Sequence, residues 1–227
     1  MKLSDRLRSC AGMVRRGGVA ADVGTDHGYL ALYLLETEIC PRVFASDLRE
    51  GPLAAARRSA AGSGVSDRIT LVLSDGLSAM DMGEIDTVII AGMGGDTIRS
   101  ILDREPGVRD GSKQLILQPQ SKTAELRQYL DVSGFRILRE ILSRDGRFLY
   151  TAMEAVYDGV TRHRSPGQSL VPDCLRGDPL YRAYLTRERA RLERTMGGLG
   201  RAREPDPSAL AFYESARLEL EEMEEAL

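Results

Sequence analysis

The sequence has few of the residues that mark secreted, membrane-bound or metal-binding proteins. Its three cysteines, Cys10, Cys40 and Cys174, are scattered, and they form neither a Cys-x-x-Cys pair nor ligand spacing with a histidine. We therefore expect a reduced, cytoplasmic setting and no metal site. The N-terminal stretch has no apolar run long enough for a signal peptide, and no later segment is apolar enough to span a membrane. No membrane partner is expected.

Length and net charge bound the architecture without identifying it. The 227 residues are enough for one full α/β domain and an appendage, and 42% hydrophobic with 29% charged residues is an ordinary globular composition. A formal net charge of −3 does not by itself indicate a nucleic-acid-binding protein. The distribution of charge along the chain matters more than its total.

The most informative stretch is VAADVGTDHGYLALYL, residues 19–34. Small and apolar residues run into DVG at 22–24, and an apolar helical pattern begins after TDHG at 25–28. A strand, a glycine-bearing turn and a helix in this order begin a nucleotide-binding α/β fold. The spacing Asp-x-Gly-x-Asp-x-Gly resembles the acidic glycine-rich motif of S-adenosylmethionine-dependent methyltransferases, with an acid at the middle glycine.

The charge of this turn distinguishes between ligands. Helix N-termini favour anions, and dinucleotides place their pyrophosphate there. The carboxylate of Asp26 would repel a pyrophosphate, whereas Asp22 and Asp26 together suit the sulfonium and ammonium groups of S-adenosylmethionine. Either acid could instead cap the following helix, but capping requires neither a second acid nor a second glycine. An NAD-binding oxidoreductase is therefore disfavoured.

The apolar segments that follow predict the rest of a sheet. We expect strands at 19–23, 42–46, 69–73, 86–91, 113–117, 135–142 and 148–157, with helices before Gly17, at 29–36, from Gly51 and at 122–133. The last two strands form a hairpin around 144–146. This pattern indicates an α/β, Rossmann-like class I S-adenosylmethionine-dependent methyltransferase fold: a seven-stranded sheet whose last strand is antiparallel, followed by a C-terminal α-helical hairpin or coiled coil. A dehydrogenase would close with a parallel strand.

Acidic residues follow the second and third strands. Asp47 ends the second strand, where Rossmann-like proteins bind ribose hydroxyls, and a carboxylate can accept from both hydroxyls. Asp75-Gly76 follows the third strand, where methyltransferases commonly bind the adenine amino group. An ordinary Asp-Gly turn is the alternative for this dipeptide.

The fourth strand leads into Gly92-Met93-Gly94-Gly95, whose three glycines in four positions indicate close backbone approach or positive φ angles. Amino-methyltransferases often carry an Asn/Asp-Pro-Pro-Tyr motif here, and its absence speaks against methylation of exocyclic amines. No cysteine stands here or after the fifth strand, so a covalent cytosine-5 mechanism has no nucleophile.

The C-terminal region differs in character. We expect the methyltransferase domain at 1–160, and a linker plus helical hairpin at 161–227, with the linker reaching Pro179. Helices are predicted at 180–199 and 208–227. The break between them contains several glycines and prolines, namely Gly197, Gly198, Gly200, Pro205 and Pro207.

Charge divides this hairpin. Arg176–Arg203 holds 8 arginines and 3 acids, a net of +5, whereas Glu204–Leu227 holds 1 arginine and 8 acids, a net of −7. The helices could simply neutralise each other, or the arginine helix could contact RNA phosphates. The arginines of the N-terminal helix, Arg6, Arg8, Arg15 and Arg16, are expected mostly on a solvated face near the mouth of the site.

Four motifs together carry a resemblance. DVGTDHGYL (22–30), SDGL (74–77), IIAGMGG (89–95) and LILQPQ (115–120) resemble, in order and spacing, the bacterial tRNA (adenine-22-N1)-methyltransferase family. The resemblance covers roughly 3–157, and the helical tail matches the placement of the family's C-terminal coiled coil. Gln120 departs from the family's pattern, where asparagine is expected.

The resemblance implies methyl transfer from S-adenosyl-L-methionine to ring nitrogen 1 of an adenine in the tRNA D-arm, with tRNA as partner. We expect a monomer or weak dimer. The alternatives are a methyltransferase acting on another RNA base or on a small molecule, and a non-catalytic RNA-binding protein of the same fold.

Asp26 is the candidate catalytic residue, because it could accept from the amino group of the target adenine or take the proton lost after transfer. His27 could contact the cofactor, and Tyr29 could stack on the target base. The alternatives are that His27 is an ordinary side chain at the start of a helix and that Tyr29 is a half-buried helix tyrosine. The candidate cofactor-binding residues are Asp22, Gly24, Thr25, His27, Gly28, Asp47, Leu48, Asp75, Gly76, Gly92 and Met93. The candidate substrate-binding residues are Tyr29, Gly94, Gln118 and Pro119.

Overall fold

The computed structural model describes residues 3–200 and 206–227. The chain divides into two compact units, Met1–Thr161 and Arg162–Leu227, and each is described by itself. Within the described ranges, no helix combines the length and the apolar character needed to cross a bilayer.

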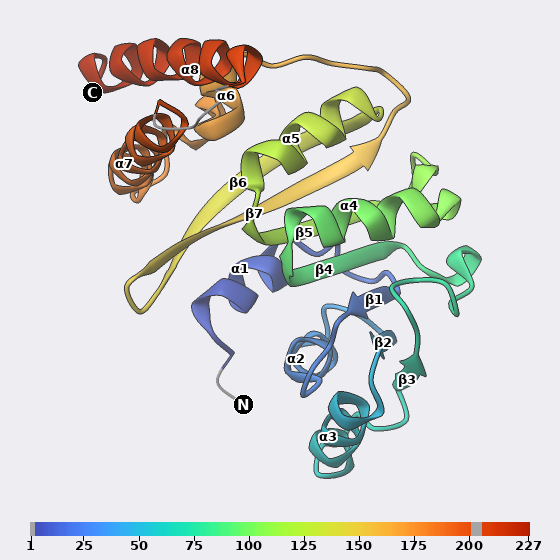
Figure 1. Cartoon of the computed structure of the whole chain (residues 1–227). Coiled ribbons are helices and arrows are strands. Elements are labelled where there is room, and N and C mark those ends of the chain that lie inside the picture. Colours follow the sequence, from blue (N-terminus) through green and yellow to red (C-terminus); the bar gives the residue numbers. More distant parts are fainter. Residues whose placement is uncertain (1–2, 201–205) are drawn as a thin grey trace. The chain divides into compact units, whose positions relative to one another are not determined.

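The first unit is built on a seven-stranded sheet in the order β3-β2-β1-β4-β5-β7-β6 (Figure 1). Strand β7 is antiparallel to both of its neighbours, and the other pairs are parallel. The predicted methyltransferase topology is therefore confirmed. The strands are β1 Ala20–Val23, β2 Val43–Asp47, β3 Ile69–Leu73, β4 Thr87–Gly94, β5 Gln114–Ser121, β6 Phe135–Asp145 and β7 Phe148–Tyr157.

Helices follow most of the strands. They are α1 Asp5–Met13, α2 Tyr29–Glu36, α3 Glu50–Ala61, α4 Gly95–Arg104 and α5 Thr123–Val132, with 3-10 helices η1 Met82–Glu84 and η2 Pro106–Arg109. The sequence predicted α2 at its observed bounds and α1, α3 and α5 to within a few residues. It did not predict α4.

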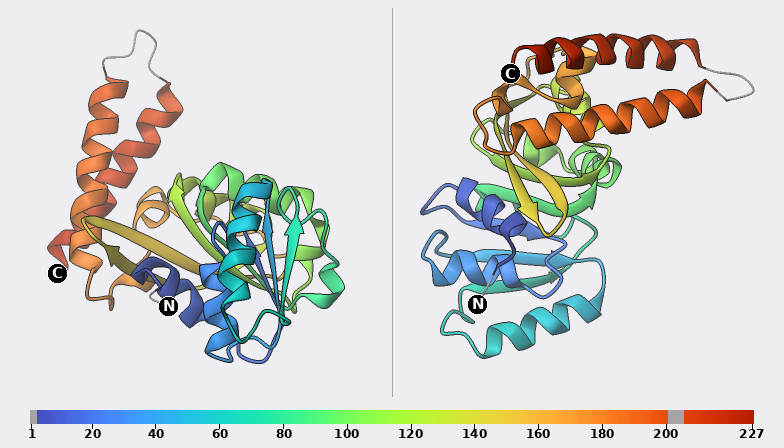
Figure 2. Two further views of the ribbon diagram at one scale, coloured as in Figure 1. Left: turned by 90° about the horizontal axis from the view of Figure 1, so that it is seen from below. Right: turned by 90° about the vertical axis from the view of Figure 1, so that its left-hand side faces the viewer.

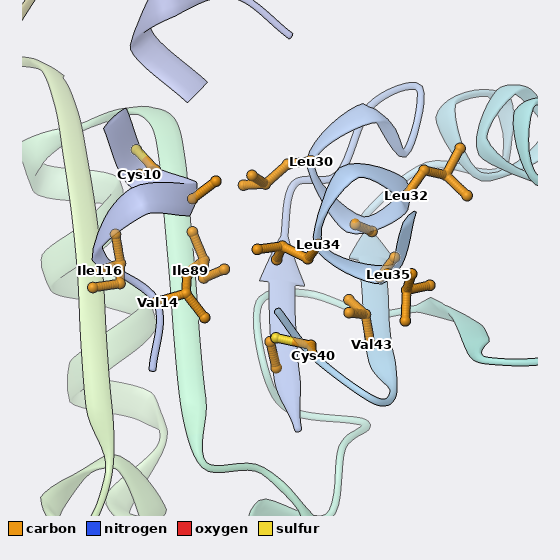
Figure 3. Close-up of a cluster of buried hydrophobic side chains, with 14 of the residues drawn as sticks. Cys10, Val14, Leu30, Leu32, Leu34, Leu35, Cys40, Val43, Ile89 and Ile116 are labelled. Atoms are coloured by element: carbon orange, nitrogen blue, oxygen red, sulfur yellow. The ribbon is translucent and has the colours of Figure 1, made fainter. Parts of the chain in front are cut away.

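Two clusters of buried side chains cover the two faces of the sheet, because side chains alternate along each strand. On one face, α1 and α2 pack on Ile89 of β4 and Ile116 of β5 (Figure 3). On the other face, α4 and α5 pack on the neighbouring positions Val88, Ile90 and Leu115. Strand β4 is thus buried on both faces, as its continuous apolar run predicts.

The glycine-rich segment after Ala91 corrects the expected end of β4. Strand β4 runs on through Gly94, and Gly95 begins α4. A Cβ on Gly95 would stand 2.5 Å from the carbonyl oxygen of Lys122. The glycine is therefore needed where the start of α4 passes the main chain before α5, which is the close backbone approach that the three glycines predicted.

The second unit contains α6 Pro166–Leu170, η3 Asp173–Leu175, α7 Tyr181–Leu199 and α8 Pro207–Glu225, and α7 and α8 lie side by side (Figure 2). The expectation of an irregular linker to Pro179 is wrong in part, because α6 is capped by Ser165 and packs on α8. Gly197 and Gly198 lie inside α7, and Pro207 is the first residue of α8. Pro205 lies outside the described residues.

Ion pairs with glutamates neutralise some of the arginines of α7. Arg189 pairs with Glu224 of α8, and the buried Glu188 accepts from Arg187 and Arg191. Arg182 and Arg194 are exposed and have no acidic partner in the described part of the tail. Three further charged residues of the C-terminal region, Arg201, Arg203 and Glu204, lie outside the described residues.

Candidate active site

The turn between β1 and α2 has an unusual backbone. Gly24, Asp26 and Gly28 adopt φ angles of 75°, 52° and 74°. Glycine takes this left-handed conformation without strain, and aspartate is among the few other residues that tolerate it. A Cβ on Gly28 would stand 3.0 Å from the Cβ of Ala56, so this glycine also permits α2 and α3 to pack closely.

Asp22 is the next-to-last residue of β1, two positions before Gly24, and is buried. The Thr25 hydroxyl donates to its carboxyl at 2.6 Å, and the Ala31 main chain in the first turn of α2 also bonds to it. Among the described residues no cation pairs with Asp22. Burial raises the pKa of Asp22 from 3.8 to about 6, although the two hydrogen bonds oppose the shift. Asp22 therefore accepts a hydrogen bond from the first turn of α2, but no positively charged side chain among the described residues pairs with its carboxylate.

A cavity of about 270 Å³ opens beside Asp22. Seven of the predicted site residues line it: Asp22, Gly24, Thr25, Asp26, His27, Tyr29 and Gly92. Five further residues complete the lining: Arg6, Leu7, Leu30, Ala91 and Gln120. The cavity lies at the carboxyl ends of β1 and β4, where open α/β sheets bind ligands.

Arg6 of α1 is the main functional candidate that the sequence did not single out. It is half-buried in the cavity wall, so the expectation of a solvated face does not hold for this arginine. Its Nη1 donates to Oε1 of Gln118 at 2.7 Å, and the same oxygen accepts from the Gly92 main-chain nitrogen at 3.1 Å. Gln118 thus joins α1 to the glycine segment of β4. No sequence signal distinguished Arg6 from Arg8.

The exposed side of the turn carries Asp26, His27 and Tyr29. The Asp26 side chain is 74% exposed, and its Oδ1 lies 3.7 Å from Nε2 of His27. The His27 and Tyr29 rings are stacked, with centroids 5.3 Å apart and planes 11° apart. Asp26 does not cap α2 with its side chain. The turn therefore presents a carboxylate and a pair of stacked rings to the cavity.

Asp47 lies at the carboxyl end of β2, one position beyond the Val23–Ser46 pair, which places it beside the Gly24 turn. Its side chain is only 12% exposed, and it accepts from the Arg49 main chain at 3.0 Å. Leu48, the next residue, is 68% exposed. Neither residue lines the cavity itself.

The remaining predicted residues are not among those that line the cavity. Asp75 is exposed and forms an ion pair with Arg104, which lowers the pKa of that carboxyl. The methyl group of Met93 lies against Gly24, where an added Cβ would stand 2.3 Å from it. The others are Gly28 in the turn, Gly76 after β3, Gly94 before α4, and Gln118 and Pro119 on β5.

Comparisons with known proteins identify relatives of this chain. Residues 3–153 match the methyltransferase domain family. The tRNA (adenine(22)-N(1))-methyltransferase of Bacillus subtilis is 33% identical over 168 residues, which are 71% of each chain. The structure of the B. subtilis m1A22 tRNA methyltransferase TrmK has a TM-score of 0.84 and 26% identity, covering 97% of this chain and 98% of that one.

A Streptococcus pneumoniae protein whose name also refers to m1A22 tRNA methylation has been solved in complex with S-adenosyl-L-methionine. It has a TM-score of 0.82 and 26% identity, over 96% of this chain and 99% of that one. The fold, the family and the cofactor class expected from the four motifs are confirmed. The chain belongs to the bacterial tRNA (adenine(22)-N1)-methyltransferase family of S-adenosylmethionine-dependent enzymes.

Proposed function

We propose that this protein transfers a methyl group from S-adenosylmethionine to ring nitrogen 1 of adenine-22 in the D-arm of a tRNA. The observation that carries the proposal is the buried carboxylate of Asp22 in the wall of the cavity, without a cationic partner among the described residues. A buried charge of this kind is costly unless a ligand of opposite charge compensates it. The family membership supplies the tRNA substrate.

The residues around the cavity fit the cofactor. Asp22 and the glycine at 24 suit the methionyl end, whose ammonium would compensate the buried carboxylate. Asp47, beside the same turn, suits the ribose hydroxyls. Asp75 with Gly76 suits the adenine amino group, since a carboxylate that pairs with Arg104 keeps further lone pairs to accept from it.

The raised pKa of Asp22 predicts a pH dependence of cofactor binding. Because the protonated ammonium binds the ionised carboxylate, the affinity for S-adenosylmethionine should be highest near pH 7, above the pKa of Asp22 and below that of the ammonium. Below the folded-state pKa of about 6 it should fall up to tenfold for each further pH unit. Isothermal titration calorimetry between pH 5 and 8 measures this profile. The Asp22→Asn variant should show no such inflection.

Asp26, His27 and Tyr29 are proposed to receive the target base. S-adenosylmethionine supplies the electrophilic methyl group when bound. Ring nitrogen 1 of adenine has its own lone pair, so the protein needs no strong base and acts mainly by positioning. Asp26 would accept from the amino group of the adenine, and its charge would stabilise the positive charge that the ring acquires. The stacked rings offer an apolar face to a base drawn out of the folded RNA.

The candidate residues on β4 and β5 are proposed to support the same site from the neighbouring strands. Oε1 of Gln118 is occupied by Arg6 and Gly92, so Gln118 would act through the guanidinium that it positions. Gly92 and Gly94 let the backbone of β4 pass close to the ligands, while Met93 covers the Gly24 turn. Pro119 lies opposite Met93 in the register of β4 and β5, and it would help to fix the position of the glycine segment.

For the second unit we propose a supporting role in RNA binding. Arg182 and Arg194 are the exposed arginines of α7 without an acidic partner in the described part of this unit. They would contact phosphates, a contact that salt weakens.

Methylation of an unmodified tRNA transcript tests the proposed function. The transcript is incubated with enzyme and labelled S-adenosylmethionine, digested and analysed by nucleoside mass spectrometry. We expect 1-methyladenosine, and its loss when adenine-22 of the transcript is replaced by guanine. Another methylated nucleoside would assign a different base, and tRNA binding without any methylation would indicate a non-catalytic protein. Stabilisation by NAD rather than S-adenosylmethionine in a thermal-shift assay would contradict the cofactor.

A further inference from the structure

The β6–β7 hairpin extends beyond the rest of the sheet (Figure 1). Strand β7 pairs with β5 only from Leu115↔Ala155 to Leu117↔Met153, whereas its pairing with β6 continues to Asp145↔Phe148. Because β7 is antiparallel to β5, residues 148–152 continue past the carboxyl end of the paired segment. The tip of the hairpin therefore lies at the same edge of the sheet as the cavity.

Two aromatic side chains of this hairpin form a strip with two arginines, one from the hairpin turn and one from α1. Phe148 and Tyr150 are two residues apart on β7, so they share a face, and their ring centroids are 6.4 Å apart. The guanidinium of Arg147 lies 4.9 Å from the Phe148 centroid, and that of Arg6 lies 5.7 Å from the Tyr150 centroid. Arg6 also lines the cavity. We call these four residues the hairpin strip.

The strip is exposed at its outer end. Phe148 is 53% exposed, although it is a large apolar side chain, and Arg147 beside it is also exposed. Asp145, opposite Phe148 in the register, is the acid next to the strip and is half-buried. An exposed ring beside one guanidinium group, next to a second ring with its own guanidinium, matches the chemistry of a nucleic acid strand, whose bases stack on rings and whose phosphates pair with arginine.

We propose that the hairpin strip binds the tRNA nucleotides next to the target adenine. Phe148 stacks on a neighbouring base, Arg147 pairs with a phosphate, and Arg6 with Tyr150 guides the strand into the cavity. This inference rests on the proposed function, because it deepens the substrate side of the same site. It assigns RNA binding to an element of the first unit, at the same edge of the sheet as the cavity proposed to receive the target base.

Replacement of Phe148 by alanine tests the strip. Phe148→Ala should raise the Kd for the tRNA transcript about tenfold, because an aromatic stacking contact to one base is lost. The Kd is measured by fluorescence anisotropy without cofactor, and the KM for tRNA in methylation assays should rise while kcat changes little. Phe148→Tyr keeps the ring and should restore wild-type binding. Arg147→Gln should lower the slope of log Kd against log salt concentration by about one.

Val132→Ala is the matched control, because Val132 is also a large exposed apolar residue, 49% exposed, at the far end of α5. It should leave tRNA binding unchanged. Wild-type tRNA affinity in Phe148→Ala would overturn the proposal. So would a change in sedimentation of the protein alone with tRNA affinity unaltered, which would assign the strip to self-association. A wild-type enzyme that makes no 1-methyladenosine would contradict the proposed function separately, because the anisotropy measurement does not depend on turnover.

Discussion

Replacing Asp26 by asparagine should lower kcat at least about a hundredfold while the Kd for S-adenosylmethionine stays within about threefold of wild type. The Asp26 side chain is 74% exposed at the cavity, so its removal leaves no buried group unsatisfied. The amide keeps the shape of the side chain but loses the negative charge proposed to orient the adenine and stabilise its positive charge. Steady-state methylation at saturating tRNA measures kcat, and calorimetry measures the Kd for S-adenosylmethionine.

Asparagine is a sharper substitution than alanine at this position. The φ angle of 52° at Asp26 is one that asparagine also tolerates, whereas alanine would add backbone strain of about 1 kcal/mol. Asp67→Asn, which removes an exposed carboxylate outside the cavity, is the control and should leave kcat unchanged. If Asp26→Asn lost cofactor binding and turnover together, Asp26 would be a binding residue and its catalytic assignment would be wrong.

Replacing Asp22 by asparagine should weaken S-adenosylmethionine binding by about a hundredfold, because a buried charge partner of the ammonium is removed. The asparagine oxygen can still accept from the Thr25 hydroxyl, which donates to Asp22 at 2.6 Å. The turn is therefore expected to keep its conformation. Calorimetric titration at pH 7, where Asp22 of the wild type is mostly ionised and the ammonium of the ligand is mostly protonated, gives the comparison.

The same variant should be more stable than the wild type when no cofactor is bound. The folded-state pKa of Asp22 is about 6, above its usual 3.8. Its ionisation therefore opposes folding: the cost is absent below the unfolded pKa, grows as pH rises, and is complete above the folded pKa. Asp22→Asn removes this cost, so its free energy of unfolding at pH 8 should rise by at most about 3 kcal/mol. Urea denaturation at pH 8 and pH 4 checks this, and equal differences at both pH values would contradict it.

The first βα unit could be predicted closely from the sequence. A short apolar strand, two glycines and a helical apolar period change the pattern abruptly at this turn, and α2 has the predicted bounds Tyr29–Glu36. The hairpin of β6 and β7 was also predicted, although β6 continues to Asp145. Local patterns carry this information because strand and helix have different periods.

Contacts between distant segments explain what could not be predicted. Helix α4 begins at Gly95, where the glycine is required by the approach of Lys122, 27 positions further along the chain. Arg6 reaches the cavity because Gln118, 112 positions away, accepts from it. Helix α6 is short, contains Pro166 and Gly167, and packs on α8. A pattern confined to neighbouring residues contains none of these contacts.

The central claim is that the buried Asp22 carboxylate selects a ligand with a positive charge. Calorimetry with S-adenosylmethionine and with 5′-methylthioadenosine, which has the same adenosine but no ammonium, tests it most directly. Asp22→Asn should lose about a hundredfold in affinity for the first ligand and almost none for the second. Equal losses for both ligands would mean that Asp22 maintains the shape of the pocket rather than its charge, and would contradict the account.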